Sequence, residues 1–69
     1  MTPERLAQWG EAIFGERWKA PLAREADVRL RTMFRWAAGE TPIRLTEQEL
    51  RAIAKRVHAR RGETIKELS

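Results

Sequence analysis

Apolar side chains recur along the chain at intervals of three and four residues, the spacing that places them on one face of an α-helix. Glycine and proline separate the stretches that have this pattern. No stretch alternates apolar and polar residues, so we expect no strand. The pattern predicts helices at about residues 3–14, 19–26, 30–38 and 46–61. We therefore expect an all-α fold, a compact bundle of four to five short helices, with the tail after residue 62 adding at most a frayed turn.

Local signals support the ends of the first and fourth helices. Thr2 is suited to cap the first, because its hydroxyl can accept an unpaired backbone N–H. Thr46 and Glu49 have the spacing of a capping box, in which hydroxyl and carboxylate each satisfy one backbone donor. Gly10 lies inside the first helix, where glycine costs about 1 kcal/mol relative to alanine. We expect another helix to approach closely at Gly10 in compensation.

The two middle helices are short and joined by a short turn. Pro21 is tolerable only in the first turn of its helix. If Met33 and Trp36 of the following helix face the core, its period turns the side chains on the opposite side toward solvent. Those outward side chains are Arg31, Thr32 and Arg35.

The excess of basic over acidic residues is largest in the middle of the chain. The 69 residues include 14 Lys and Arg against 10 Asp and Glu, a net charge of +4. Residues 1–16 have one basic and three acidic residues, whereas residues 17–44 have seven basic and three acidic ones. A basic excess in one segment is typical of a surface that binds a polyanion, although a solvated helix face has the same composition.

Composition argues against several functional classes. There is no cysteine and His58 is the only histidine, so we expect no disulfide, metal site or cofactor. Ser69 is the only serine, and the capping box accounts for Glu47 and Glu49, so we expect no enzyme. No apolar run is long enough to span a membrane, and the first residues lack the pattern of a signal peptide. We expect a cytoplasmic protein without a small-molecule ligand.

The segment KAPLAREADVRLRTMFRWAAGE carries the most specific pattern. Ala23 is small enough for two helices to cross, Val28 follows the turn at a position that fills the core, and Arg35-Trp36 precedes a closing Ala-Ala-Gly-Glu. In this order and spacing, residues 18–42 resemble the helix-turn-helix of lambda-repressor-like DNA-binding proteins. The resemblance implies a single domain, residues 1–69, with the helix-turn-helix at about residues 19–38.

Two positions depart from the family pattern. Asp27 stands in the turn where the family usually has glycine, but aspartate tolerates the positive φ required there. Arg29 stands where the family often has a capping serine or threonine, a cap worth about 1 kcal/mol. A cation opposes the helix dipole at this end unless an anion is present. We expect Arg29 to contact a phosphate or a base edge of DNA.

The resemblance assigns the second helix of the motif to the major groove. It implies base readout by four residues: Arg29, Arg31, Thr32 and Arg35. It implies phosphate or groove contacts by six more: Arg17, Lys19, Arg24, Leu30, Phe34 and Arg44. Leu30 and Phe34 have an alternative role as core or dimer surface, and Arg31 and Arg35 as an ordinary solvated face.

One small domain contacts few base pairs, so we expect a homodimer on an inverted-repeat operator, acting as a repressor. The fourth helix and the tail offer candidate dimer contacts, some of which must instead cover the core: Leu50, Ile53, Val57, Ile65 and Leu68. Such a chain resembles small regulators of phages and mobile elements in bacteria, including autoregulators encoded beside anti-defence genes. The alternative is a basic helical module, a phage-type inhibitor or an antitoxin, that binds an acidic protein.

Overall fold

A computed structural model describes residues 1–62 of the chain. That part of the chain contains four α-helices and no strand: α1 (Pro3–Phe14), α2 (Lys19–Glu25), α3 (Leu30–Ala38) and α4 (Glu47–Arg61). The all-α prediction is confirmed, with four helices in the described residues where four to five were expected. The turn expected in the tail lies outside them.

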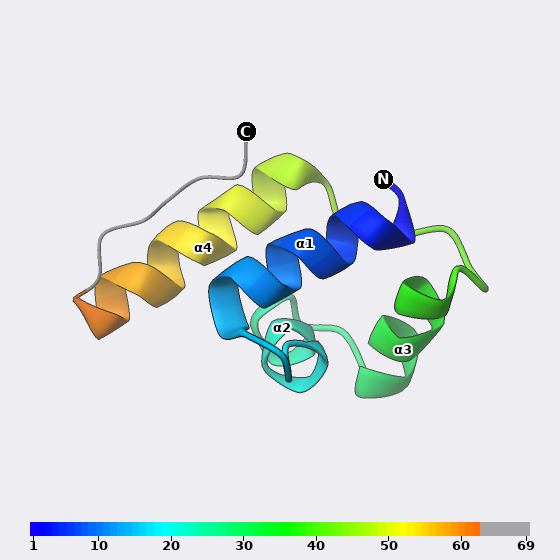
Figure 1. The fold of residues 1–69 in the computed structure, drawn as a ribbon, viewed down its shortest axis with the longest axis horizontal. Helices are drawn as coiled ribbons and strands as arrows, with labels where there is room; N and C mark the ends of the chain where they lie inside the picture. Colours follow the sequence, from blue (N-terminus) through cyan, green and yellow to red (C-terminus); the bar gives the residue numbers. More distant parts are fainter. Residues whose placement is uncertain (63–69) are drawn as a thin grey trace.

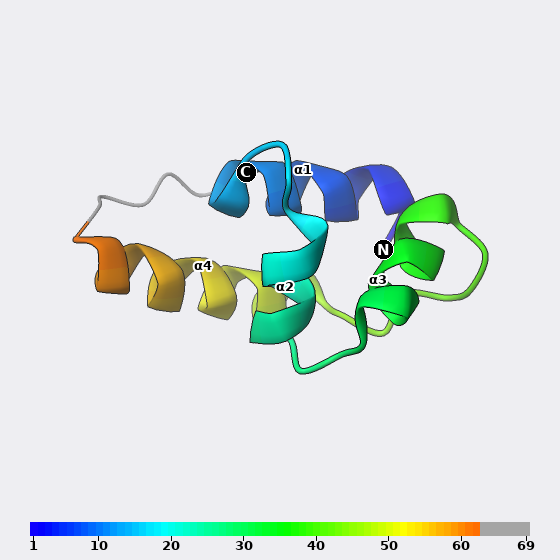
Figure 2. The same cartoon turned by 90° about the horizontal axis from the view of Figure 1, so that it is seen from below.

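The other three helices pack around α1 (Figure 1). α1 and α4 form two layers along the long axis of the molecule, and α2 lies across them (Figure 2). α3 packs against both α2 and α1 and lies at one end of the molecule. This arrangement leaves the side of α3 that points away from α1 and α2 open to solvent.

The core draws side chains from every helix and from the segment before α4. The three tryptophans, Trp9, Trp18 and Trp36, are at most 4% exposed. Leu45 precedes the capping position of α4 and is also buried, which the sequence did not indicate because it lies outside any periodic stretch. The remaining buried hydrophobic residues are Leu6, Ile13, Leu22, Ala23, Met33, Leu50, Ile53, Ala54 and Val57.

The dimer contacts predicted on α4 are wrong. Leu50, Ile53 and Val57 are 0%, 4% and 2% exposed in the single chain. They complete the core beneath α1, because a domain this small needs the whole apolar stripe of α4 to cover its interior. Ile65 and Leu68 lie outside the described residues.

The helix caps agree with the sequence in part. Thr2 Oγ1 accepts the Arg5 backbone N–H at 3.1 Å, and Thr46 Oγ1 accepts that of Glu49 at 3.1 Å. The expected second bond of the capping box, in which the Glu49 carboxylate accepts a backbone N–H, is not formed. The Thr46 hydroxyl donates to that carboxylate instead, at 3.2 Å.

Glu47 does not serve the capping box but joins α4 to α1. Its Oε1 accepts hydrogen bonds from Arg5 Nε at 2.8 Å and from Trp9 Nε1 at 3.1 Å. These bonds and the neighbouring guanidinium charge lower the pKa of the Glu47 carboxyl. The indole N–H of the buried Trp9 thereby gains the partner that its burial requires.

Gly10 is a point of close approach, and its neighbour is the side chain of Trp18 at the start of α2. A Cβ at Gly10 would lie 2.3 Å from Cδ2 and Cε3 of Trp18. Trp18 directly precedes α2. The absence of a side chain at Gly10 therefore lets the indole seat the start of α2 against α1.

Candidate nucleic-acid interface

The connection between α2 and α3 is a tight turn with one residue in the left-handed region. Asp27 has φ of 57°, in agreement with the sequence prediction that it tolerates this conformation. The Val28 N–H donates to the Ala23 carbonyl at 2.9 Å, and the half-buried Val28 side chain packs against the core. The turn therefore fixes the direction in which α3 leaves α2.

The start of α3 has no side-chain cap. Arg29 occupies the capping position in an extended conformation, with φ of −69° and ψ of 145°, and its side chain makes no hydrogen bond to the helix. No acidic residue lies in the first turn of α3 to complement its dipole. This helix end is therefore electrostatically suited to an anion.

α3 has sharply different inner and outer faces. Met33 and Trp36 are buried, whereas Arg31 and Arg35 are exposed, as the helical period predicts. Thr32 is half-buried and not fully outward, because it lies at the side of the helix next to the segment that leads to α4. Arg31 and Arg35 are one turn apart and project from the same side of α3.

The basic residues of the described chain fall into two groups. Those on the α1 and α4 side mostly have partners within the chain. Arg60 pairs with the Glu25 carboxylate, and Arg61 donates to the Ile13 carbonyl at 3.0 Å. Within residues 1–62, by contrast, no ion pair or side-chain hydrogen bond is formed by the three basic residues of the α3 face, Arg29, Arg31 and Arg35.

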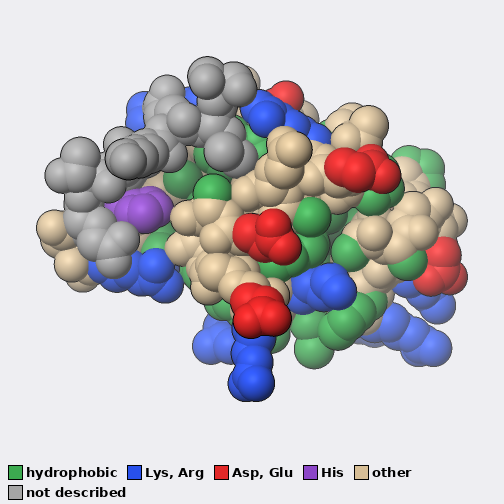
Figure 3. Space-filling view, in the orientation of Figure 1, with side chains coloured by type: hydrophobic (Ala, Val, Ile, Leu, Met, Phe, Trp, Pro, Cys, Tyr) green, Lys and Arg blue, Asp and Glu red, His purple; other side chains and the backbone are tan. Residues whose placement is uncertain are grey.

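Further cations flank this face. Arg17, Arg24 and Arg44 are exposed, on three different segments of the chain. Figure 3 shows one face of the molecule: several acidic side chains lie over α1, and basic ones project along the lower edge, below α2 and α3, as well as at the upper and left edges. The three-dimensional structure therefore brings basic residues of the middle segment together around α3.

Lys19 is held by two aromatic rings. Its Nζ lies 4.9 Å from the centre of the Phe34 ring and 5.8 Å from that of Trp18, distances at which an ammonium is attracted to an aromatic face. The sequence did not indicate this contact, because Lys19 and Phe34 belong to different helices and no spacing rule relates them. It fixes the ammonium beside α3.

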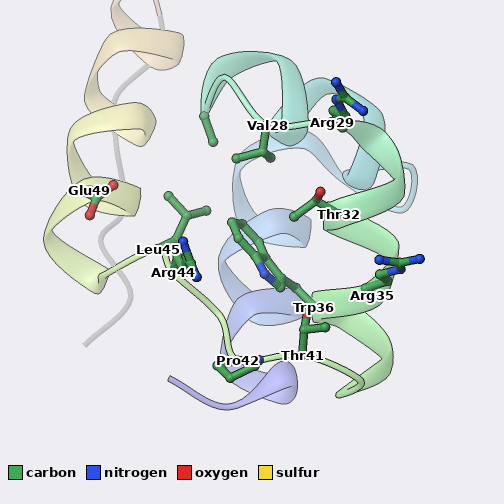
Figure 4. Close-up of a pocket in the computed structure, with 11 residues that line it drawn as sticks. Val28, Arg29, Thr32, Arg35, Trp36, Thr41, Pro42, Arg44, Leu45 and Glu49 are labelled. Carbon is green, nitrogen blue, oxygen red and sulfur yellow. The ribbon is translucent and has the colours of Figure 1, made fainter.

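A hollow of about 750 Å³ lies between α3, the segment before α4 and the first turn of α4. Its floor includes Trp36 and Leu45, and Thr32 points into it (Figure 4). Arg29 and Arg35 stand at its rim and point outward from α3 in the same view. The hollow is open, and it has no set of catalytic groups: Glu49 is its only carboxylate among the described residues.

Leu30 and Phe34 are 45% and 50% exposed. The alternative that they belong to the core is therefore excluded. Together with Glu16, Arg17, Lys19 and Ala20 they line a shallow groove between α3 and the start of α2.

Residues 1–62 have neither a metal-ligand cluster nor a membrane-spanning helix. No group of three or more His, Cys, Asp or Glu side chains is placed to hold a metal ion. No helix in this part of the chain is long and apolar enough to cross a membrane. No protein-family model, curated protein or solved structure gives a significant match to the chain.

Proposed function

We propose that the protein binds double-stranded DNA in a sequence-specific manner, with α3 in the major groove. In this proposal α2, the turn at residues 26–29 and α3 act as a helix-turn-helix. The observation that carries it is the outer face of α3, where Arg29, Arg31 and Arg35 are exposed and make no ion pair within the described chain.

The dimensions of α3 suit the groove. An α-helix with its side chains is about 10–12 Å across, and the major groove of B-form DNA is about 12 Å wide. Arginine donates two parallel hydrogen bonds to O6 and N7 of guanine. Arg31 and Arg35, on successive turns of α3, are suited to read neighbouring base pairs in this way, with Arg29 and Thr32 at the edges of the same surface.

The surrounding cations suit the phosphate backbone. Arg17, Arg24 and Arg44 are exposed around α3, and Lys19 is held beside it by Phe34. Contacts of this kind orient a protein on the duplex and supply affinity without reading sequence. The unpaired helix start at Arg29 adds a position that favours a phosphate.

We further propose that the protein acts as a homodimeric repressor on an inverted repeat. A single module of this size buries little surface on DNA, and a pair of half-sites raises both affinity and specificity. The burial of Leu50, Ile53 and Val57 in the single chain removes them as dimer contacts. The proposed two-fold interface therefore uses other residues, and sedimentation of the free protein tests whether it forms.

The proposed function is tested by selection from a pool of random duplexes, followed by titration of the selected and a scrambled duplex. The selected duplex should bind about 10³-fold or more tightly than the scrambled one. Affinity should fall steeply as salt rises, since phosphate contacts release counterions. Failure to select any duplex would refute sequence-specific DNA binding. Failure to bind any duplex at low salt would in addition favour the alternative, an acidic protein partner for the same basic face.

A further inference from the structure

The outer surface of α3 is not uniformly polar. Leu30 and Phe34 lie one helical turn apart and are about half exposed, and Met1 is the only other large apolar side chain so exposed in residues 1–62. We call Leu30 and Phe34 the apolar edge of α3. It lies directly beside Arg31 and Arg35, so a ligand that covers the arginines also meets the apolar edge.

We infer that the apolar edge binds the 5-methyl groups of thymines in the major groove. This inference rests on the proposed function and specifies the bases that α3 reads. The thymine methyl is the apolar group that the base pairs of unmodified DNA display in the major groove. Covering it with Leu30 or Phe34 removes apolar surface of both partners from water. Arg31 and Arg35 then face guanines next to those thymines.

Charge distinguishes DNA from a second copy of the chain as the partner of this edge. α3 has no acidic residue, and Arg31 and Arg35 lie beside the apolar edge. A two-fold contact between two such edges would bring the arginines of both copies together, and like charges in contact are unfavourable. Duplex DNA offers an apolar methyl within a polyanionic surface, which complements both parts of α3.

Lys19 completes the surface. Its ammonium lies 4.9 Å from the centre of the Phe34 ring, at the side of the apolar edge next to α2. Phe34 thus contacts a cation while remaining half exposed, which leaves part of it accessible to a base. Phe34 therefore links base readout to a phosphate contact by Lys19.

The test removes single methyl groups from DNA. The full chain first selects a duplex of about 20 base pairs from a random pool. Each thymine is then replaced in turn by deoxyuridine, which lacks only the 5-methyl group. At one or two positions the affinity should fall about fourfold, the factor that corresponds to burial of one methyl. Leu30→Ala or Phe34→Ala should bind the thymine and deoxyuridine forms of such a position equally.

Lys55→Ala is the matched control, because Lys55 is exposed on α4, away from α3. It should keep the full thymine preference. The inference would be overturned if both Leu30→Ala and Phe34→Ala kept the thymine preference. It would also be overturned if the wild-type chain bound the thymine and deoxyuridine forms equally at every position. In both cases DNA binding itself would stand. Failure to select a duplex would overturn the proposed function as well. If the free protein is a dimer and Leu30→Ala or Phe34→Ala converts it to a monomer, the apolar edge serves self-association and the inference is overturned.

Discussion

Replacement of Gly10 by alanine tests the packing that seats α2, and with it α3, on α1. An ideal Cβ at Gly10 would lie 2.3 Å from Cδ2 and Cε3 and 2.7 Å from Cγ of Trp18. These are atoms near the root of a rigid ring that is only 4% exposed, so the indole has no room to yield by a small rotation. The added methyl must displace the indole or separate α1 from α2.

The expected loss of stability follows from two opposing effects. Alanine gains about 1 kcal/mol over glycine in helix propensity. Overpacking of a filled core costs about 1–3 kcal/mol, and expulsion of a buried aromatic ring costs about 3–5 kcal/mol. The clash distances favour the upper part of these costs, about 3–5 kcal/mol, so after the propensity gain Gly10→Ala should lower the free energy of unfolding by about 2–4 kcal/mol. The melting temperature should fall by about 4–8 °C for each kcal/mol.

Urea and thermal unfolding, followed by circular dichroism, measure the effect. Ala12→Gly is the matched control, because Ala12 is exposed in the same helix and isolates the propensity difference. If Gly10→Ala stabilises the protein by as much as Ala12→Gly destabilises it, the indole does not fill the space above Gly10, and the packing described for Trp18 is wrong.

Three further predictions concern individual contacts. Thr46→Ala should destabilise the fold by about 1 kcal/mol in urea unfolding, because it removes the cap on the Glu49 N–H. A variant as stable as the wild type would contradict that role. The lowered pKa of Glu47 means that its contribution is complete above the carboxyl pKa of the unfolded chain and is lost as pH falls through the lower folded value. Glu47→Gln should therefore reduce the loss of unfolding free energy on acidification. An unchanged dependence of that free energy on pH would show that the contact of Glu47 with Arg5 does not contribute to it. Arg29→Ser should stabilise α3 by about 1 kcal/mol through a new cap and weaken DNA binding, and a stabilised variant with full affinity would show that Arg29 does not contact DNA.

The helices were predictable because each is encoded locally. The bounds of α1, α3 and α4 follow within a residue or two from local signals. These signals are the periodic apolar residues, the caps Thr2 and Thr46, and the glycines at the helix ends. The positive φ of Asp27 also follows from the local sequence, since few residues tolerate it. These features depend on neighbours in the chain, which a single sequence displays.

The errors arose where a side chain had two possible uses. The stripe on α4 could cover the core or a partner, and only the packed structure shows that Leu50 and Val57 are needed inside. Glu47 was attributed to a cap because its partners, Arg5 and Trp9, are 42 and 38 residues away. At the candidate site, the outward arginines followed from helical period, whereas the contact of Lys19 with Phe34 depends on the angle between two helices.

The central claim is that the outer face of α3 reads duplex DNA. The most direct test is the affinity of Arg31→Ala and Arg35→Ala for the selected and the scrambled duplex, beside Lys55→Ala, which also removes one positive charge. Each arginine variant should lose about 1–3 kcal/mol on the selected duplex and should discriminate less between the two duplexes. Lys55→Ala should discriminate as the wild type does. Equal losses for all three variants on both duplexes would show that only net charge matters, and would contradict sequence readout by α3.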